Sequence, residues 1–163
     1  MKVLVIGGAG YIGSHVVKEF LKNDSEVTVY YNLSTGQTIN LFPKAKFVEG
    51  DILDYAKLVE TMKEGFDAVV HLAAKKAVGE SMENPQKYST NNITGSLNIL
   101  NAMLETKTNN IIFSSSAAVY GMPEYLPVDE KHPVNPISYY GFTKAEIEQF
   151  MRWYDLTKGL KYM

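Results

Sequence analysis

Several features that would assign a protein to a special class are absent from this sequence. Its 163 residues include no cysteine, which excludes a disulfide framework and a thiolate metal site. No basic run argues for nucleic acid, and at a net charge of −2 no acidic tail argues for a disordered partner. No apolar run approaches membrane-spanning length, and the chain begins directly with an apolar segment, leaving no room for a signal peptide. We therefore expect a cytoplasmic protein with no metal and with neither nucleic acid nor a membrane as partner.

What is present is the pattern of one ordinary α/β domain. With 45% hydrophobic residues the chain can bury a core. Helix signals stand between apolar runs, among them a capping Asp54 and an Asn84-Pro85 step that starts a long helix. Alternating strands and helices predict a doubly wound parallel sheet of the Rossmann type over residues 1–163. Strands are expected at residues 3–6, 27–31, 47–50, 68–72 and 111–113.

The first fourteen residues carry the strongest local signal. An apolar run at residues 3–6 is followed at once by Gly7, Gly8, Gly10 and Gly13, and then by apolar residues at helical spacing. Strand, glycine turn and helix form the context in which G-x-G-x-x-G binds a dinucleotide. Glycine permits the tight turn and the close approach of a pyrophosphate, which the free N–H groups of the new helix then hold. The alternative is a βα turn without a ligand.

In such sheets, ligands gather at the carboxyl ends of the strands, where the strand order reverses. This rule brings four loops together, at residues 7–13, 31–36, 72–76 and 114–116. The last predicted helix, from about Ser138 to Thr157, begins near the same edge.

A tyrosine and a lysine stand one helical turn apart at the start of that helix. In Tyr140-x-x-x-Lys144 the lysine's charge favours the phenolate form of the tyrosine, which can then remove a hydroxyl proton. Tyr154 and Lys158 repeat the spacing. Because Tyr154 lies over three turns further along and away from the strand ends, we interpret it as structural.

Several motifs in order resemble the extended short-chain dehydrogenase/reductases and, among them, the UDP-glucose 4-epimerases, over the whole chain. The most specific are the Lys76-Ala-Val-Gly-Glu-Ser81 run and the triple serine of Phe113-Ser-Ser-Ser-Ala-Ala-Val-Tyr-Gly121. The others are Gly7 to His15, Gly50-Asp51-Ile52, His71-Leu-Ala-Ala, Asn91-Asn92 and Tyr140-x-x-x-Lys144.

The resemblance implies roles for individual residues. Tyr140 would be the general base. Lys144 would favour the phenolate form of Tyr140 and would bind the nicotinamide ribose. Ser116 would form a hydrogen bond with the reacting sugar oxygen. The alternative for Ser116 is a strand-terminal serine that caps nearby backbone, and His71 is interpreted as a hydrogen-bonded core residue. The implied NAD site comprises Gly7, Gly8, Gly10, Tyr11, Ile12 and Gly13 at the pyrophosphate; Tyr31, Asn32, Leu33, Gly36, Asp51 and Ile52 toward the adenosine; and Leu72, Ala73, Ala74, Lys76, Asn91, Tyr140 and Lys144 along the other half.

The implied activity is NAD-dependent epimerisation at C4 of a UDP-hexose by transient hydride transfer, in a homodimer. Two departures weigh against full activity. Tyr31 stands where an acidic residue should bind the adenosine ribose, with no nearby arginine to indicate NADP. The family also continues past Met163 with a substrate-binding region that is absent from this sequence. The alternatives are another extended family member acting on a nucleotide sugar, with Ala117-Ala118 counting against a dehydratase, and an NAD-binding module without turnover.

Overall fold

The predicted parallel sheet is confirmed in a computed structural model, which describes residues 1–34 and 38–163. Six strands pair in the order β3-β2-β1-β4-β5-β6, and every pairing is parallel. The order reverses between β1 and β4, so the carboxyl edge of this pair is the place where a ligand is expected. The strands are β1 (Lys2–Ile6), β2 (Glu26–Tyr31), β3 (Lys46–Glu49), β4 (Ala68–His71), β5 (Asn110–Phe113) and β6 (Lys161–Tyr162).

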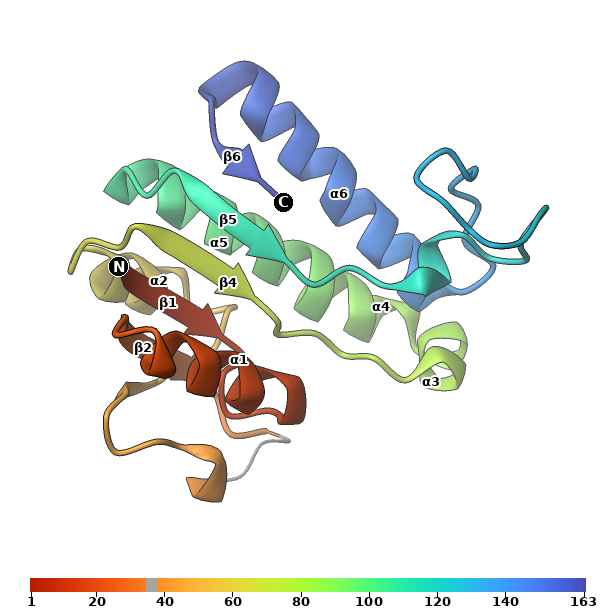
Figure 1. Ribbon diagram of the computed structural model, residues 1–163. Coiled ribbons are helices and arrows are strands. Elements are labelled where there is room, and N and C mark those ends of the chain that lie inside the picture. Colours follow the sequence, from red (N-terminus) through yellow and green to blue (C-terminus); the bar gives the residue numbers. More distant parts are fainter. Residues whose placement is uncertain (35–37) are drawn as a thin grey trace.

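Helices cover both faces of the sheet. In Figure 1, α1 lies in front of the strands, and α2 and α5 lie behind them. The helical segments are α1 (Tyr11–Lys22), η1 (Thr38–Asn40), α2 (Tyr55–Met62), α3 (Val78–Glu83), α4 (Pro85–Tyr88), η2 (Ser89–Thr94), α5 (Gly95–Thr106), η3 (Ala117–Val119) and α6 (Tyr139–Lys158).

The alternation of side chains along β1 divides the core in two. Val3 and Val5 join the cluster under α1, whereas Leu4 and Ile6 join the larger cluster under α2, α5 and α6. Three of these four side chains are fully buried and the fourth, Ile6, is nearly so, as expected for a central parallel strand. Each such side chain contributes about 1.5–3 kcal/mol to folding. The apolar run at the start of the chain therefore anchors the glycine turn that follows it.

The long helix predicted from Asn84-Pro85 is a composite. A short helix, α4, begins at Pro85 as predicted, but the π-helix η2 separates it from α5. The additional helix α3 precedes it and was not predicted. The π-turn carries Asn91 and Asn92, and the Asn92 side chain bonds the backbone of Lys75 in the loop after β4. A single regular helix would not give both asparagines this placement.

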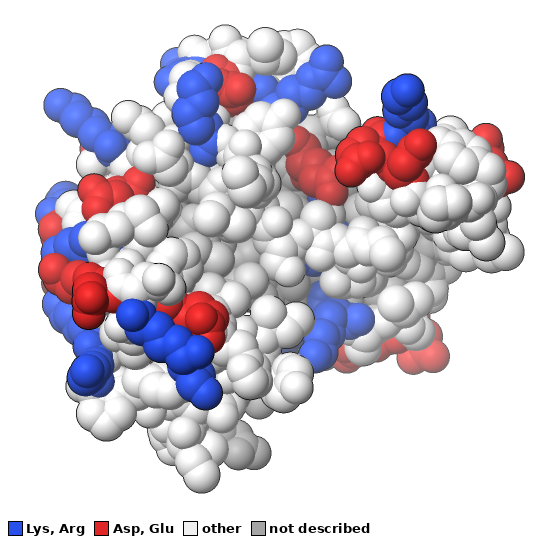
Figure 2. All heavy atoms as spheres, in the orientation of Figure 1, with Lys and Arg blue, Asp and Glu red and all other residues white. Residues whose placement is uncertain are grey.

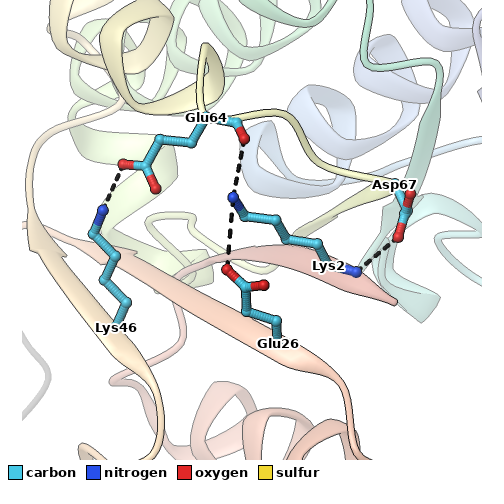
Figure 3. Close-up of polar contacts among 5 residues, drawn as sticks. All are labelled: Lys2, Glu26, Lys46, Glu64 and Asp67. Carbon is cyan, nitrogen blue, oxygen red and sulfur yellow. Dashed lines mark hydrogen bonds and ion pairs between the residues drawn. The ribbon is translucent and has the colours of Figure 1, made fainter.

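The amino ends of β1, β2 and β3 are joined to the segment between α2 and β4 by charged side chains (Figure 3). The Lys2 backbone N–H donates to Asp67 at 2.7 Å, and its ammonium donates to the Glu64 carbonyl at 2.9 Å and lies 3.6 Å from Glu26. Lys46 pairs with the Glu64 carboxylate at 2.6 Å. These contacts are largely exposed, so each ion pair contributes under about 1 kcal/mol. They lie at the opposite edge of the sheet from the glycine turn.

None of the helices in residues 1–34 and 38–163 is both long enough and apolar enough to cross a membrane.

Candidate functional site

The glycine turn is fixed by contacts that no larger residue could make. Gly7 has φ +94°, and a Cβ there would lie 2.8 Å from the Ala73 backbone nitrogen. A Cβ on Gly13 would lie 2.2 Å from the Gly7 carbonyl oxygen, and one on Gly8 would lie 2.9 Å from the Val29 side chain. The turn therefore packs at once against α1, β2 and the loop after β4.

Gly10 differs from its neighbours because its side-chain position is nearly open. Its φ of −76° and ψ of 173° suit any residue, and a Cβ would meet only the Gly7 oxygen at 3.3 Å and Tyr31 at 4.0 Å. Gly10 is the N-cap of α1, and no side chain caps this helix, whereas Asp54 caps α2 and Ser138 caps α6. The first-turn N–H groups of α1 have no acceptor within the helix. They remain available to an anion.

A cavity of about 750 Å³ opens beside this turn at the carboxyl edge of the sheet. Two large side chains at its mouth, Tyr11 and Ile12, are 78% and 60% exposed. Apolar surface of this kind next to uncapped N–H groups fits a ligand that combines an anionic group with an apolar part. Predicted residues that line the cavity are Gly7, Gly10, Tyr11, Ile12, Gly13, Tyr31, Asn32, Ile52, Leu72, Ala73, Ala74, Lys76 and Asn91.

Five described residues that were predicted to bind the cofactor do not line this cavity: Gly8, Leu33, Asp51, Tyr140 and Lys144. Gly8 packs between α1 and β2, and Leu33, in a left-handed conformation at φ 55°, packs against the core cluster under α1. The Asp51 carboxylate accepts from the Asn32 amide at 2.8 Å and the Leu53 N–H at 2.9 Å. Asp51 therefore holds the loop that presents Asn32. Gly36 lies outside the described residues.

Asn92, which the sequence analysis named only within the Asn91-Asn92 motif and gave no role, holds the cavity wall formed by residues 72–76. Its buried amide accepts from the Lys75 N–H at 2.8 Å and donates to the Lys75 carbonyl at 3.0 Å and to Thr143 on α6 at 3.2 Å. Asn91 donates to the Asn92 side-chain oxygen at 2.9 Å. The only sequence signal for this role was the asparagine pair itself.

Lys144 joins α6 to the edge of the cavity. Its Nζ donates to the carbonyl oxygen of Ser114, a lining residue, at 2.7 Å, and lies 4.5 Å from the Phe113 ring centroid and 6.0 Å from that of Tyr140. Burial lowers the pKa of the Lys144 ammonium to about 8, and the charge of Glu148 opposes that change. The cation is thus close enough to Tyr140 to stabilise negative charge on its ring.

The N-terminus of α6 is held by three side chains. The Tyr140 N–H donates to the Ser81 hydroxyl at 3.0 Å, the Gly141 N–H to Ser138 at 3.1 Å, and the Tyr139 N–H to the sulfur of Met82 at 3.3 Å. Ser81 ends the Lys76-Ala-Val-Gly-Glu-Ser81 run and is fully buried. Sequence reasoning used this run only as a resemblance, and its serine positions Tyr140.

The η3 turn, which follows Ser116, comes close to the same helix through a backbone contact of Ala118. A Cβ on Gly141 would lie 2.4 Å from the Ala118 carbonyl oxygen, so α6 approaches the η3 turn as only glycine allows. The Ser116 hydroxyl accepts from the Ala118 N–H at 3.2 Å. Ser116 therefore caps η3, as the structural alternative predicted, and its hydroxyl proton remains available to a second partner.

Two residues set aside in the sequence analysis make internal contacts. His71 is buried, its Nε2 lies 2.8 Å from the Ser96 hydroxyl, and burial together with the Lys144 charge lowers its pKa to about 3. It is therefore neutral at physiological pH. Tyr154 donates to Asn101 at 2.7 Å and packs against the larger core cluster.

Charge and metal ligands add no further site. Figure 2 shows acidic and basic side chains interspersed around the face in view, with a largely uncharged centre. Within residues 1–34 and 38–163, no three His, Asp or Glu side chains gather as a metal site requires.

Comparisons with known proteins agree with this geometry. A sequence model of the NAD dependent epimerase/dehydratase family matches residues 3–163. UDP-glucose 4-epimerase of Lactobacillus helveticus is 48% identical over 99% of this chain and 49% of its own length. The crystal structure of UDP-glucose 4-epimerase from Brucella ovis in complex with NAD superposes with a TM-score of 0.96 at 48% identity, over 99% of this chain and 50% of that one. The Bifidobacterium longum enzyme in complex with NAD+ and UDP gives a TM-score of 0.92 at 35% identity, over 97% and 50%.

The chain spans about half the length of the curated relatives it matches. The family match covers nearly all of this chain, from the first strand to its last residue. Sequence, sheet order and the glycine-lined cavity thus lead to one assignment. The chain belongs to the NAD dependent epimerase/dehydratase family.

Proposed function

We propose that the cavity binds NAD, with the pyrophosphate on the uncapped N-terminus of α1. The residues fit this group because a Cβ at Gly10 would enter nearly open space beside free N–H donors. Solved relatives in complex with NAD support the assignment. In this proposal the loop after β2 and residues 51–52 hold the adenosine end, and residues 72–76, Asn91 and Lys144 hold the nicotinamide end.

We further propose that the chain supplies the catalytic residues for epimerisation at C4 of a UDP-hexose. The observation that carries this proposal is the bond from Lys144 Nζ to the carbonyl of Ser114, which joins the cavity to α6, the helix that carries Tyr140 in its first turn. When bound in this cavity, NAD would supply the hydride chemistry that epimerisation at C4 requires. Relatives that are UDP-glucose 4-epimerases support the choice of substrate.

The protein residues would manage the proton of the C4 hydroxyl. Tyr140 accepts this proton as the C4–H bond breaks and gives it back when that bond re-forms on the other face, so the residue is unchanged at the end of a cycle. Ser116 donates a hydrogen bond to the C4 oxygen and keeps its proton. The Lys144 ammonium stabilises the phenolate form of Tyr140, which is the form that can accept the proton.

Turnover by the 163-residue polypeptide is the test. The chain spans half the length of its relatives, so we propose that most of the energy that holds the UDP group is missing from it. Losing such remote binding lowers the chemical rate as well as the affinity. We therefore expect NAD binding with slow conversion of UDP-galactose to UDP-glucose, far below the rate of a full-length relative, during prolonged incubation followed by chromatography.

The chain contains its own matched control. Tyr140→Phe should abolish the slow conversion, whereas Tyr154→Phe, at the second tyrosine–lysine pair, should retain it. NAD binding without conversion in either variant or in the parent would favour a binding module instead. A parent rate near that of a full-length epimerase, if lost in Tyr140→Phe, would refute the idea that substrate-binding energy is missing.

A further inference from the structure

The three consecutive serines after β5 are each held by a different contact. The Ser114 carbonyl accepts from Lys144 Nζ at 2.7 Å, and the Ser115 hydroxyl donates to the Glu148 carboxylate. Ser116 accepts from the Ala118 N–H. Lys144 and Glu148 are four residues apart on α6 and so share one face of the helix. Side chains from two successive turns of α6 therefore form hydrogen bonds with two successive residues of the same segment.

The two side chains that form these hydrogen bonds, Lys144 and Glu148, carry opposite charges. Lys144 is 3% exposed and is surrounded by the rings of Phe113 and Tyr140, with neutral His71 on β4 beyond Phe113. Burial lowers the pKa of Lys144 to about 8, and Glu148 is the one acidic residue of the described chain whose charge acts to raise it. A glutamine at residue 148 could accept the Ser115 hydrogen bond equally well. A purely structural link thus has no need of the negative charge.

We propose that Glu148 is a positioning residue of the site: its hydrogen bond to Ser115 fixes the segment that carries Ser114 and Ser116, and its charge keeps Lys144 in the ammonium form. The inference rests on the proposed function, because it assigns Glu148 a part in preparing Lys144 and Ser116 for that reaction. Glu148 itself contacts no reacting atom and acts through its neighbours.

Three variants separate the hydrogen bond from the charge. Glu148→Gln keeps an acceptor oxygen for Ser115 and removes the charge. Ser115→Ala removes the hydrogen bond and keeps the charge. Glu146→Gln is the matched control, because Glu146 is an acidic residue of the same helix two positions away and therefore on another face.

The readout is the titration of Lys144 in the polypeptide labelled with carbon-13 at lysine Cε, the resonance being assigned by its loss in Lys144→Met. In Glu148→Gln the midpoint should fall by about half a pH unit or more. The midpoint should stay at the parent value in Glu146→Gln. In Ser115→Ala the midpoint should lie above that of Glu148→Gln. As the pH is raised, the affinity for NAD measured by calorimetric titration should begin to fall at a lower pH in Glu148→Gln than in the parent.

An unchanged midpoint in Glu148→Gln would overturn the proposal, as would an equal fall in Glu146→Gln. A fall of about half a pH unit or more in Ser115→Ala would show that the hydrogen bond alone is responsible, which also overturns the proposal. Because this outcome is judged against the parent, Ser115→Ala tests the proposal even if Glu148→Gln does not fold. A parent that binds no NAD at any pH would instead overturn the proposed function, and the Lys144 midpoint would still test the role of Glu148.

Discussion

Lys144 holds a positive charge inside the protein, and its titration should be visible in the stability of the whole chain. The side chain is 3% exposed, and burial lowers its pKa from 10.5 to about 8. The bond to the Ser114 carbonyl and the adjacent Phe113 ring offset part of the cost of burying the charge. The remaining free-energy cost of burying the ammonium destabilises the folded state and is absent from the unfolded chain.

The direction of the pH effect follows from the two pKa values. Below about pH 8 the folded and unfolded chains both hold the proton, and the folded chain bears the full cost. Between about pH 8 and pH 10.5 the unfolded chain binds more protons, so the free energy of unfolding rises with pH. The gap between the two pKa values, at about 1.4 kcal/mol for each pH unit, amounts to about 3 kcal/mol.

Urea unfolding of the parent and of Lys144→Met at about pH 7, pH 9 and pH 10.5 measures this effect. The difference in unfolding free energy between the two proteins should move in the parent's favour by about 3 kcal/mol across the range. Other ionising groups are common to both proteins and cancel. Lys158→Met, at an exposed lysine of the same helix, should show no such change. Parallel curves for the parent and Lys144→Met would refute a buried ammonium.

Four other outcomes are expected. Gly10→Val should fold, as judged by circular dichroism, but lose NAD binding in calorimetry, because its side chain enters the cavity; undiminished affinity would contradict the pyrophosphate assignment. Tyr31→Asp should tighten NAD binding by supplying a charged ribose acceptor, at about 1.5–3 kcal/mol for each hydrogen bond, unless Tyr31 already serves the ribose, in which case the dissociation constant will not improve. Ser81→Ala should cost about 1–3 kcal/mol in urea unfolding, because the Tyr140 N–H loses its acceptor; an unchanged midpoint would show that another group replaces it. By resemblance, light scattering above micromolar concentration should give the mass of a two-fold dimer built on the helices starting near Pro85 and Ser138, and a monomer mass would exclude it.

The sequence predicted those parts of the molecule that are set by local chemistry. The apolar run before Gly7, the cap at Asp54 and the start of the last helix near Ser138 all lie where the pattern indicated. These features depend on neighbours within a few residues, and so they can be recognised without the fold. The gathering of the glycine turn with residues 72–76 also followed, because strand order alone brings those loops together.

Contacts between distant segments could not be predicted in the same way. Asn92, in the π-turn at residues 89–94, bonds a loop residue 17 positions earlier and a helix residue 51 positions later. The support of Tyr140 by Ser81 spans 59 residues. Neither contact leaves a periodic signature, since each depends on one side chain meeting one backbone group after the elements have packed.

Asn92 also bears on how this domain assembles. Its amide, carried by the η2 turn, bonds both the loop after β4 and α6, so displacement of any one of these three segments breaks a hydrogen bond to another. The wall of the cavity and the helix that carries Tyr140 and Lys144 therefore form one cooperative unit, closed by a single side chain. Opening of this unit would loosen the cavity wall and the helix that carries Tyr140 and Lys144 in the same event.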